Sequence, residues 1–220
     1  MASRPEKKGV ERPAPRLYLV TPPVADAAQF GDHLAAALEG ADVAAVLLRL
    51  CQDDERGRIN CAKALVPIVQ RKDAALLLDV DADLVARAGA DGAHLSGIDN
   101  VTTALASLKP ERIVGAGGML TRHDAMLAAD GGADYVMFGE PDAAGHRPPF
   151  AAIEERLAWW AEICEVPCVG FAANADEVPA LGRAGADFIA IGDFVWADAR
   201  GPRLAVAEAA QRLRLPEAVR

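Results

Sequence analysis

The stretch Ala88-Gly89-Ala90-Asp91-Gly92 decides the fold, because near-copies of it recur at two later points of the chain. The copies read Gly131-Gly132-Ala133-Asp134-Tyr135 and Ala184-Gly185-Ala186-Asp187-Phe188. Each follows an Ala-rich helical stretch and precedes a short apolar run. Its glycine suits the left-handed residue that ends a helix, where a side chain would be strained. A phrase that ends a helix and begins a strand, used three times, predicts a fold of repeating βα units.

Eight short runs, most of them continuously apolar, are the predicted strands. They lie at 17–21, 43–50, 74–79, 92–95, 112–116, 135–139, 167–171 and 188–192. Helix-like segments alternate with them at 27–38, 59–71, 82–88, 101–108, 123–129, 153–163, 175–184 and 205–213. Continuous apolar runs are typical of parallel strands covered on both faces. Eight alternations in 220 residues predict an α/β protein with a single (β/α)8 TIM barrel, whose active site lies at the carboxyl ends of the strands. An open dinucleotide-binding sheet is disfavoured, because no GxGxxG follows the first run.

Residues 1–15 differ from the rest of the chain in composition. They are rich in Lys, Arg, Glu and Pro and contain no hydrophobic stretch that could act as a secretion signal. We therefore predict a flexible N-terminal leader over 1–15 and one barrel domain over 16–220. Asp26, Thr121 and Asn174 stand at the start of three helix-like segments, and their side chains make them candidate N-caps.

The composition excludes several classes of function. A net charge of −9, with no basic run beyond Lys7-Lys8, argues against a nucleic-acid partner, since a polyanion needs a basic face. No apolar run approaches the roughly 18 residues of a membrane span. We therefore expect no membrane partner and a cytoplasmic protein. The four cysteines lack the C-x-x-C spacing of a structural zinc site.

Five phrases, in this order, connect the chain with a known family: RLYLVT (16–21), VLLR (46–49), AGADGAHL (88–95), GADYVMFG (132–139) and AGAD (184–187). Their order resembles the thiamine phosphate synthase family, which includes the thiazole tautomerases. The resemblance spans about residues 16 to 200 and implies a (β/α)8 barrel. It also implies the family reaction, in which hydroxymethylpyrimidine diphosphate is joined to thiazole phosphate and diphosphate is expelled. Mg²⁺ would neutralise that leaving group, and no organic cofactor is implied.

The resemblance implies a metal site and an anion site at the strand ends. The family's Gln-x-Arg-x-Lys phrase keeps only Arg49, a candidate substrate-binding residue whose alternative role is an ion pair with Asp79. Val80 stands where the family has a metal-binding aspartate, and valine cannot bind Mg²⁺. Asp79, Asp81 and Asp99 are the candidate metal ligands, since hard oxygen atoms suit this ion. Asp81 and Asp99 are alternatively helix caps.

Three further residues are candidate substrate-binding groups. His94 lies in the phrase that lines the barrel, where it is either a hydrogen-bonded core residue or a base. Arg147 follows the sixth strand and could stand in for a family lysine, while Asp193 follows the eighth strand, where the family presents a small serine to phosphate. Glu140 and Asp142 either attract a cationic ligand or only solvate their loop.

The sequence leaves three hypotheses open for the function. Gly-Gly-Met at 117–119 and Ala-Ala at 172–173 replace the family's Ser-x-His-type and Gly-Gly phrases. The chain is either a divergent thiamine phosphate synthase, a diverged paralogue whose acidic barrel mouth binds another small molecule, or a non-catalytic partner protein. No catalytic residue is assigned. Each hypothesis except the last places a small-molecule ligand at the carboxyl-end mouth, and the more exposed of Trp159 and Trp160 is a candidate for a contact in a homo-oligomer.

Overall fold

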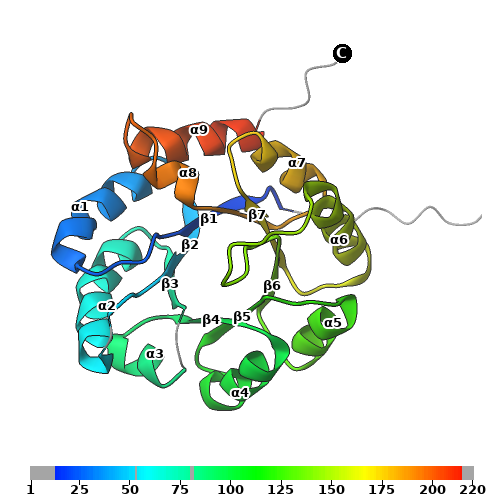
Figure 1. Ribbon diagram of the computed structural model, residues 1–220, viewed down its shortest axis with the longest axis horizontal. Coiled ribbons are helices and arrows are strands. Elements are labelled where there is room, and N and C mark those ends of the chain that lie inside the picture. The colour runs from blue at the N-terminus through cyan, green and yellow to red at the C-terminus, as the bar shows by residue number, and fades with distance from the viewer. Residues whose placement is uncertain (1–12, 53, 80–81, 215–220) are drawn as a thin grey trace, which may run out of the picture.

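Eight parallel strands close into a barrel in chain order, so the predicted (β/α)8 fold is confirmed. The structure is a computed structural model that describes residues 13–52, 54–79 and 82–214. Figure 1 shows the strands at the centre and the helices as a ring around them. Each strand pairs with the next one along the chain, and β8 closes the barrel on β1 through the register Arg16↔Phe188 to Leu19↔Ile191.

The elements follow the predicted alternation, with ends that shift by a few residues. The strands are β1 (Arg16–Val20), β2 (Val43–Leu48), β3 (Ala75–Leu78), β4 (Gly92–Ser96), β5 (Ile113–Gly117), β6 (Tyr135–Phe138), β7 (Cys168–Ala172) and β8 (Phe188–Ile191). The helices are α1 (Ala27–Leu38), α2 (Glu55–Gln70), α3 (Ala82–Ala88), α4 (Ile98–Leu108), α5 (Arg122–Asp130), α6 (Phe150–Ile163), α7 (Glu177–Arg183), α8 (Asp193–Trp196) and α9 (Pro202–Arg214). The sequence did not predict α8, a single turn that directly follows β8.

The repeated phrase has one structural role at all three of its positions. Gly89, Gly132 and Gly185 have φ values of 75°, 104° and 98°, which confirms the left-handed residue predicted there. The aspartate two residues later then bonds to an earlier strand. Asp91 Oδ2 accepts the backbone N–H of Leu76 on β3, at 2.7 Å. Asp134 does the same for β5 and Asp187 for β7. These three carboxylates therefore fasten the amino-terminal end of the barrel.

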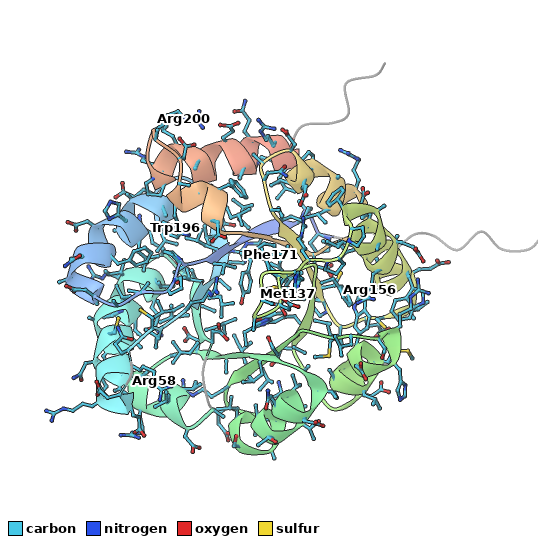
Figure 2. All side chains as sticks on the ribbon, viewed as in Figure 1. Arg58, Met137, Arg156, Phe171, Trp196 and Arg200 are labelled. Carbon is cyan, nitrogen blue, oxygen red and sulfur yellow. The ribbon has the colours of Figure 1, made fainter. Side chains whose placement is uncertain are left out.

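Side chains alternate along the strands between the barrel lumen and the layer under the helices. The lumen cluster includes Tyr18, Leu47, Tyr135 and Met137, with Phe171 packed against it. Figure 2 shows Met137 and Phe171 inside the ring of strands. The barrel is therefore a packed core, and only the side chains at its carboxyl ends can meet a ligand.

Two of the three predicted helix caps are confirmed. Asp26 accepts the backbone N–H of Ala28 at 2.8 Å, and Thr121 forms a capping box with Asp124. Asn174 is displaced from its predicted role, because α7 begins later and Asp176 holds the N-cap position. The Asn174 side chain still accepts the backbone N–H groups of Asp176 and of Glu177, the first residue of α7.

Some predictions fall partly outside the described residues. The predicted leader over 1–15 has only its last three residues, 13–15, in the described part, and the barrel domain over 16–220 is described to Arg214. None of the helices formed by residues 13–52, 54–79 and 82–214 is long and apolar enough to cross a membrane.

Candidate functional site

Arg49 and Asp79 meet at the carboxyl ends of β2 and β3. The backbone N–H of Asp79 donates to the carbonyl of Leu48, which sets the two strand ends side by side. Arg49 Nε lies 3.9 Å from Asp79 Oδ2, and both side chains are close to half exposed. The ion pair that the sequence offered as an alternative role for Arg49 is therefore present. It is loose, so the guanidinium keeps donors that can face a ligand.

Asp79 carries a perturbed carboxyl group. Burial raises its pKa above the usual value, and the nearby Glu140 carboxylate raises it further. The Arg49 guanidinium acts in the opposite direction, because its positive charge favours the ionised carboxylate. Groups from the ends of β2 and β6 therefore act on Asp79 across the mouth.

His94 belongs to a buried hydrogen-bonded chain that crosses the barrel lumen. Its Nδ1 atom lies 2.9 Å from the hydroxyl of Tyr135, which in turn lies 2.8 Å from the hydroxyl of Tyr18. Its Nε2 atom lies 3.0 Å from Oε2 of Glu140. His94 is only 2% exposed, whereas the Glu140 side chain is 16% exposed and marks the end of the chain at the mouth. The core and the mouth are thus linked through one imidazole.

Glycines on β5 make room for this chain. A Cβ atom on Gly115 would overlap the hydroxyl of Tyr135, and one on Gly117 would overlap Oε1 of Glu140 and Nε2 of His94. Gly118 contributes its backbone N–H, which donates to Glu140 Oε1. The Gly-Gly-Met segment that replaces a Ser-x-His-type phrase of the family therefore has a structural reason: it accommodates the Glu140 carboxylate.

Arg147 lies against the ends of β6 and β7 and the start of α7, and is held there by four hydrogen bonds. Two of them join its guanidinium to Glu177 as a fork, at 3.0 and 2.8 Å. The others run to the carbonyls of Gly139 and Phe171. Both members of the ion pair are mostly buried, at 16% and 14% exposure. Glu177 also accepts the backbone N–H of Ala173 after β7, at 2.9 Å.

Within the described part of the chain, neither Asp193 nor Asp99 forms a side-chain hydrogen bond or ion pair with these groups. Asp193 is exposed at the first position of α8. Asp99 is exposed in the first turn of α4, where Gly97 holds the N-cap position, so the alternative role of Asp99 as a cap is wrong. Asp99 lines a surface depression of about 310 Å³ with Gly97, Gly118 and Asp124. Asp81 lies outside the described residues.

The described residues do not form the metal site that the resemblance implies. Nowhere in residues 13–52, 54–79 and 82–214 do three His, Cys, Asp or Glu side chains come close enough to hold a metal ion. Asp79 pairs with Arg49, and Asp99 faces a different depression. The magnesium assignment to Asp79, Asp81 and Asp99 therefore stays a prediction.

Tyr18, Tyr135 and Glu177 were not predicted from the sequence as parts of the site, and Glu140 had two alternative roles. One signal was available for the lumen chain. Gly115 and Gly117 are two apart on a strand, so they face the same side. Two glycines on one face of a buried strand indicate that larger groups from elsewhere approach closely.

Comparisons with known proteins match most of the chain. The family model described as thiamine monophosphate synthase matches residues 17–195. A thiamine-phosphate synthase of Rhodospirillum centenum is 40% identical over 201 residues, covering 88% of this chain and 95% of that protein. One of Hyphomonas neptunium is 37% identical over 203 residues, covering 89% of this chain and 92% of that protein.

A solved structure shows the same fold. The thiamine phosphate pyrophosphorylase of Pyrococcus furiosus superposes with a TM-score of 0.75 at 22% identity, covering 90% of this chain and 95% of that one. At that identity the likeness concerns the fold alone, whereas the family model and the curated relatives extend over the barrel and its mouth. On these matches, the chain belongs to the thiamine monophosphate synthase family.

Proposed function

We propose that this chain catalyses the thiamine-phosphate synthase reaction at the carboxyl-end mouth of its barrel. In that reaction the bond between the pyrimidine methylene carbon and the diphosphate oxygen breaks. The thiazole nitrogen supplies the electron pair for the new C–N bond, and diphosphate leaves. The observation that carries the proposal is the 40% identity to a protein named thiamine-phosphate synthase over 95% of its length.

Arg49 is the proposed contact for the departing diphosphate. It stands at the end of β2 with a side chain 43% exposed, and the loose pair with Asp79 at 3.9 Å leaves donors for phosphate oxygens. A hydrogen bond to a charged group contributes about 1.5–3 kcal/mol. Loss of the guanidinium should therefore cost roughly tenfold to a hundredfold in turnover at low substrate concentration.

Magnesium is a proposed participant that the described donor set supports only in part. Asp79 offers a hard oxygen ligand at the strand ends, and a bound Mg²⁺ would neutralise the charge of the leaving diphosphate. Since no three-ligand group is present among the described residues, we derive no step through the ion.

A second candidate function is the binding of a small ligand without a phosphate at β7 and β8. Phosphate sites in such barrels use the loops after these two strands. Here the backbone N–H of Ala173 is taken by Glu177, and Asp193 stands exposed at the end of β8. A carboxylate about 4 Å from a phosphate repels it by roughly 1–4 kcal/mol. These groups favour a neutral or cationic ligand.

The experiment that tests the proposed reaction is a product assay. Hydroxymethylpyrimidine diphosphate, thiazole phosphate and Mg²⁺ are incubated with the protein, and thiamine phosphate is measured by fluorescence after oxidation. We expect product from the wild type and at least a tenfold loss of kcat/KM in Arg49→Ala. Arg122→Ala, which removes an exposed arginine paired with Glu155 of α6, is the control and should leave the rate unchanged. No product from the folded wild type would overturn the proposal.

A further inference from the structure

The hydrogen-bonded chain of side chains that runs from Tyr18 to Glu140 has a direction, and the proposed reaction does not use it. It begins in the packed lumen, passes through two buried phenols and a buried imidazole, and ends on a carboxylate at the mouth. We infer that this chain positions the Glu140 carboxylate as the hydrogen-bond acceptor that recognises N–H groups on the ring of the bound ligand. The identity of that ring, an aminopyrimidine, rests on the proposed function.

The hydrogen bonds of this side-chain series can all be satisfied in only one donor-to-acceptor direction. Burial raises the pKa values of Tyr18 and Tyr135, so each keeps its hydroxyl proton. An ionised Glu140 carboxylate only accepts, so His94 Nε2 must donate to it. The Nδ1 atom of a neutral imidazole then accepts from the Tyr135 hydroxyl, whose oxygen accepts from the Tyr18 hydroxyl. Every proton of the chain has an acceptor in this arrangement.

The opposite arrangement leaves a proton unsatisfied. A doubly protonated His94 would donate from both ring nitrogens, which forces Tyr135 to donate to Tyr18. The Tyr18 hydroxyl proton would then have no acceptor among residues 13–52, 54–79 and 82–214. A buried hydroxyl without a partner is destabilising, because it loses its hydrogen bond to water and gains none in return. The neutral imidazole with its proton on Nε2 is therefore favoured.

Glu140 retains acceptor capacity after these bonds are made. Its Oε2 atom accepts from His94 and its Oε1 atom accepts from Gly118. Each carboxylate oxygen has two acceptor sites, so one site on each oxygen remains. The side chain is 16% exposed at the end of β6, and Asp79 is near enough to interact with it electrostatically. While ionised, the Glu140 carboxylate accepts hydrogen bonds and donates none.

A carboxylate held in this way selects ligands that donate hydrogen bonds over ligands that accept them. A ring amino group offers N–H donors to Glu140, whereas a ring oxo group in the same place presents a second acceptor. A site built to pair with a substrate N–H rejects an analogue that lacks it by large factors, because the buried partner stays unpaired. We therefore expect discrimination between a 4-aminopyrimidine and its 4-oxo counterpart of at least tenfold.

The first test measures that discrimination by calorimetry. The probes are 4-amino-5-hydroxymethyl-2-methylpyrimidine and its 4-oxo analogue, which carry no phosphate. The wild type should bind the amino probe at least tenfold more tightly, and Glu140→Gln should lose this preference. Glu162→Gln, which makes the same change at an exposed position on α6, is the control and should keep it. Equal preference in Glu140→Gln and wild type would overturn the inference.

The second test reads the positioning chain without any ligand. The protein has four histidines, and His33, His123 and His146 are exposed. Replacing these three by Gln leaves His94 as the sole histidine, whose ring nitrogens are then observed by ¹⁵N NMR. We expect a proton on Nε2 and none on Nδ1, and a shift of the Nδ1 resonance in Tyr135→Phe. A doubly protonated ring at pH 7.5, or a proton on Nδ1, would overturn the assignment.

The two tests also separate this inference from the proposed reaction. Failure of the reaction is seen in the wild type, as absence of product. The inference alone fails if the wild type forms product and Glu140→Gln keeps the wild-type preference for the amino probe. If the wild type binds neither pyrimidine probe, the aminopyrimidine assignment falls with the proposed function, and the His94 ring alone decides whether the chain positions Glu140.

Discussion

Gly117 and Glu140 share one space at the barrel mouth, because a Cβ atom on Gly117 would overlap Oε1 of the Glu140 carboxylate. The same Cβ would overlap Nε2 of His94, so both ends of the hydrogen bond between these two side chains depend on the glycine. This relationship makes β5 part of the site, although β5 supplies no charged side chain to it.

Gly117→Ala should therefore destabilise the protein and disturb the site together. Overpacking a filled core costs about 1–3 kcal/mol, which we expect to see as a lower Tm in thermal unfolding. Gly31→Ala is the control, because the added Cβ on α1 would meet the end of the flexible Ile68 side chain at 3.3 Å and Leu65 Cδ2 at an ordinary 3.9 Å. Since alanine suits a helix better than glycine, that variant should be neutral or slightly stabilising. An equal decrease of Tm in Gly117→Ala and Gly31→Ala would contradict the claim that a Cβ on Gly117 overlaps the Glu140 carboxylate.

Arg147→Ala should act mainly on stability. Removing the guanidinium leaves Glu177 without its forked partner at a mostly buried position, and loss of one member of a buried pair costs about 3–5 kcal/mol. Because both side chains retain slight exposure, we expect about 2–3 kcal/mol, measured by denaturant unfolding. The matched control is Arg122→Ala, whose exposed pair with Glu155 should contribute less than about 1 kcal/mol. Unchanged stability together with a raised KM would instead favour a substrate-binding Arg147.

Asp79→Asn should stabilise the protein at neutral pH. Burial raises the pKa of Asp79 in the folded protein above its usual 3.8, so folding disfavours the ionised form. The contribution of Asp79 to stability is thus fully present below pH 3.8 and is lost as the pH rises through the folded value. Asparagine cannot ionise, so Tm should rise at pH 7 and stay unchanged at pH 3. The side chain is nearly half exposed, which limits the gain to less than about 1 kcal/mol. A lower Tm at pH 7 would mean that the pair with Arg49 outweighs burial.

Asp198→Asn should have the opposite pH dependence. Hydrogen bonds from Arg200 lower the pKa of Asp198 from 3.8 to about 2, so its contribution to stability is present above pH 3.8 and is lost as the pH falls toward 2. The substitution should lower Tm at pH 7, with a difference that shrinks as the pH is lowered from 5 to 2. High salt should also reduce the difference, because the pair is near the surface. A difference that is constant with pH would show that the Asp198 charge contributes nothing.

The fold could be predicted from the sequence because its signals are local. The Gly-Ala-Asp phrase ends a helix and begins a strand with its own few residues, and the predicted bounds of α1 and α3 match the structure. The helix α8 escaped prediction because one turn of four residues has no periodicity to detect. Strand-end residues such as Arg49 and Asp79 could also be predicted to lie at the mouth, since they directly follow apolar runs.

The partners within the site could not be predicted, because they are set by contacts between distant strands. Tyr18 and Tyr135 look like ordinary apolar strand residues, and only barrel closure brings their hydroxyl groups to 2.8 Å. The sequence predicts that Arg147 stands in for a substrate-binding lysine, and the fold places its guanidinium against Glu177 at the start of α7. Charge and position along the chain therefore identify candidate residues, whereas packing decides which of them stay available to a ligand.

The most direct test of the proposed function is calorimetric titration of hydroxymethylpyrimidine diphosphate into the full-length protein, with and without Mg²⁺. We predict magnesium-dependent binding in the micromolar range, weakened at least tenfold by Arg49→Ala. Absence of binding at millimolar ligand, in a protein shown to be folded by its thermal transition, would contradict the proposed function. In that case the neutral or cationic ligands favoured by Glu177 and Asp193 would be tested next.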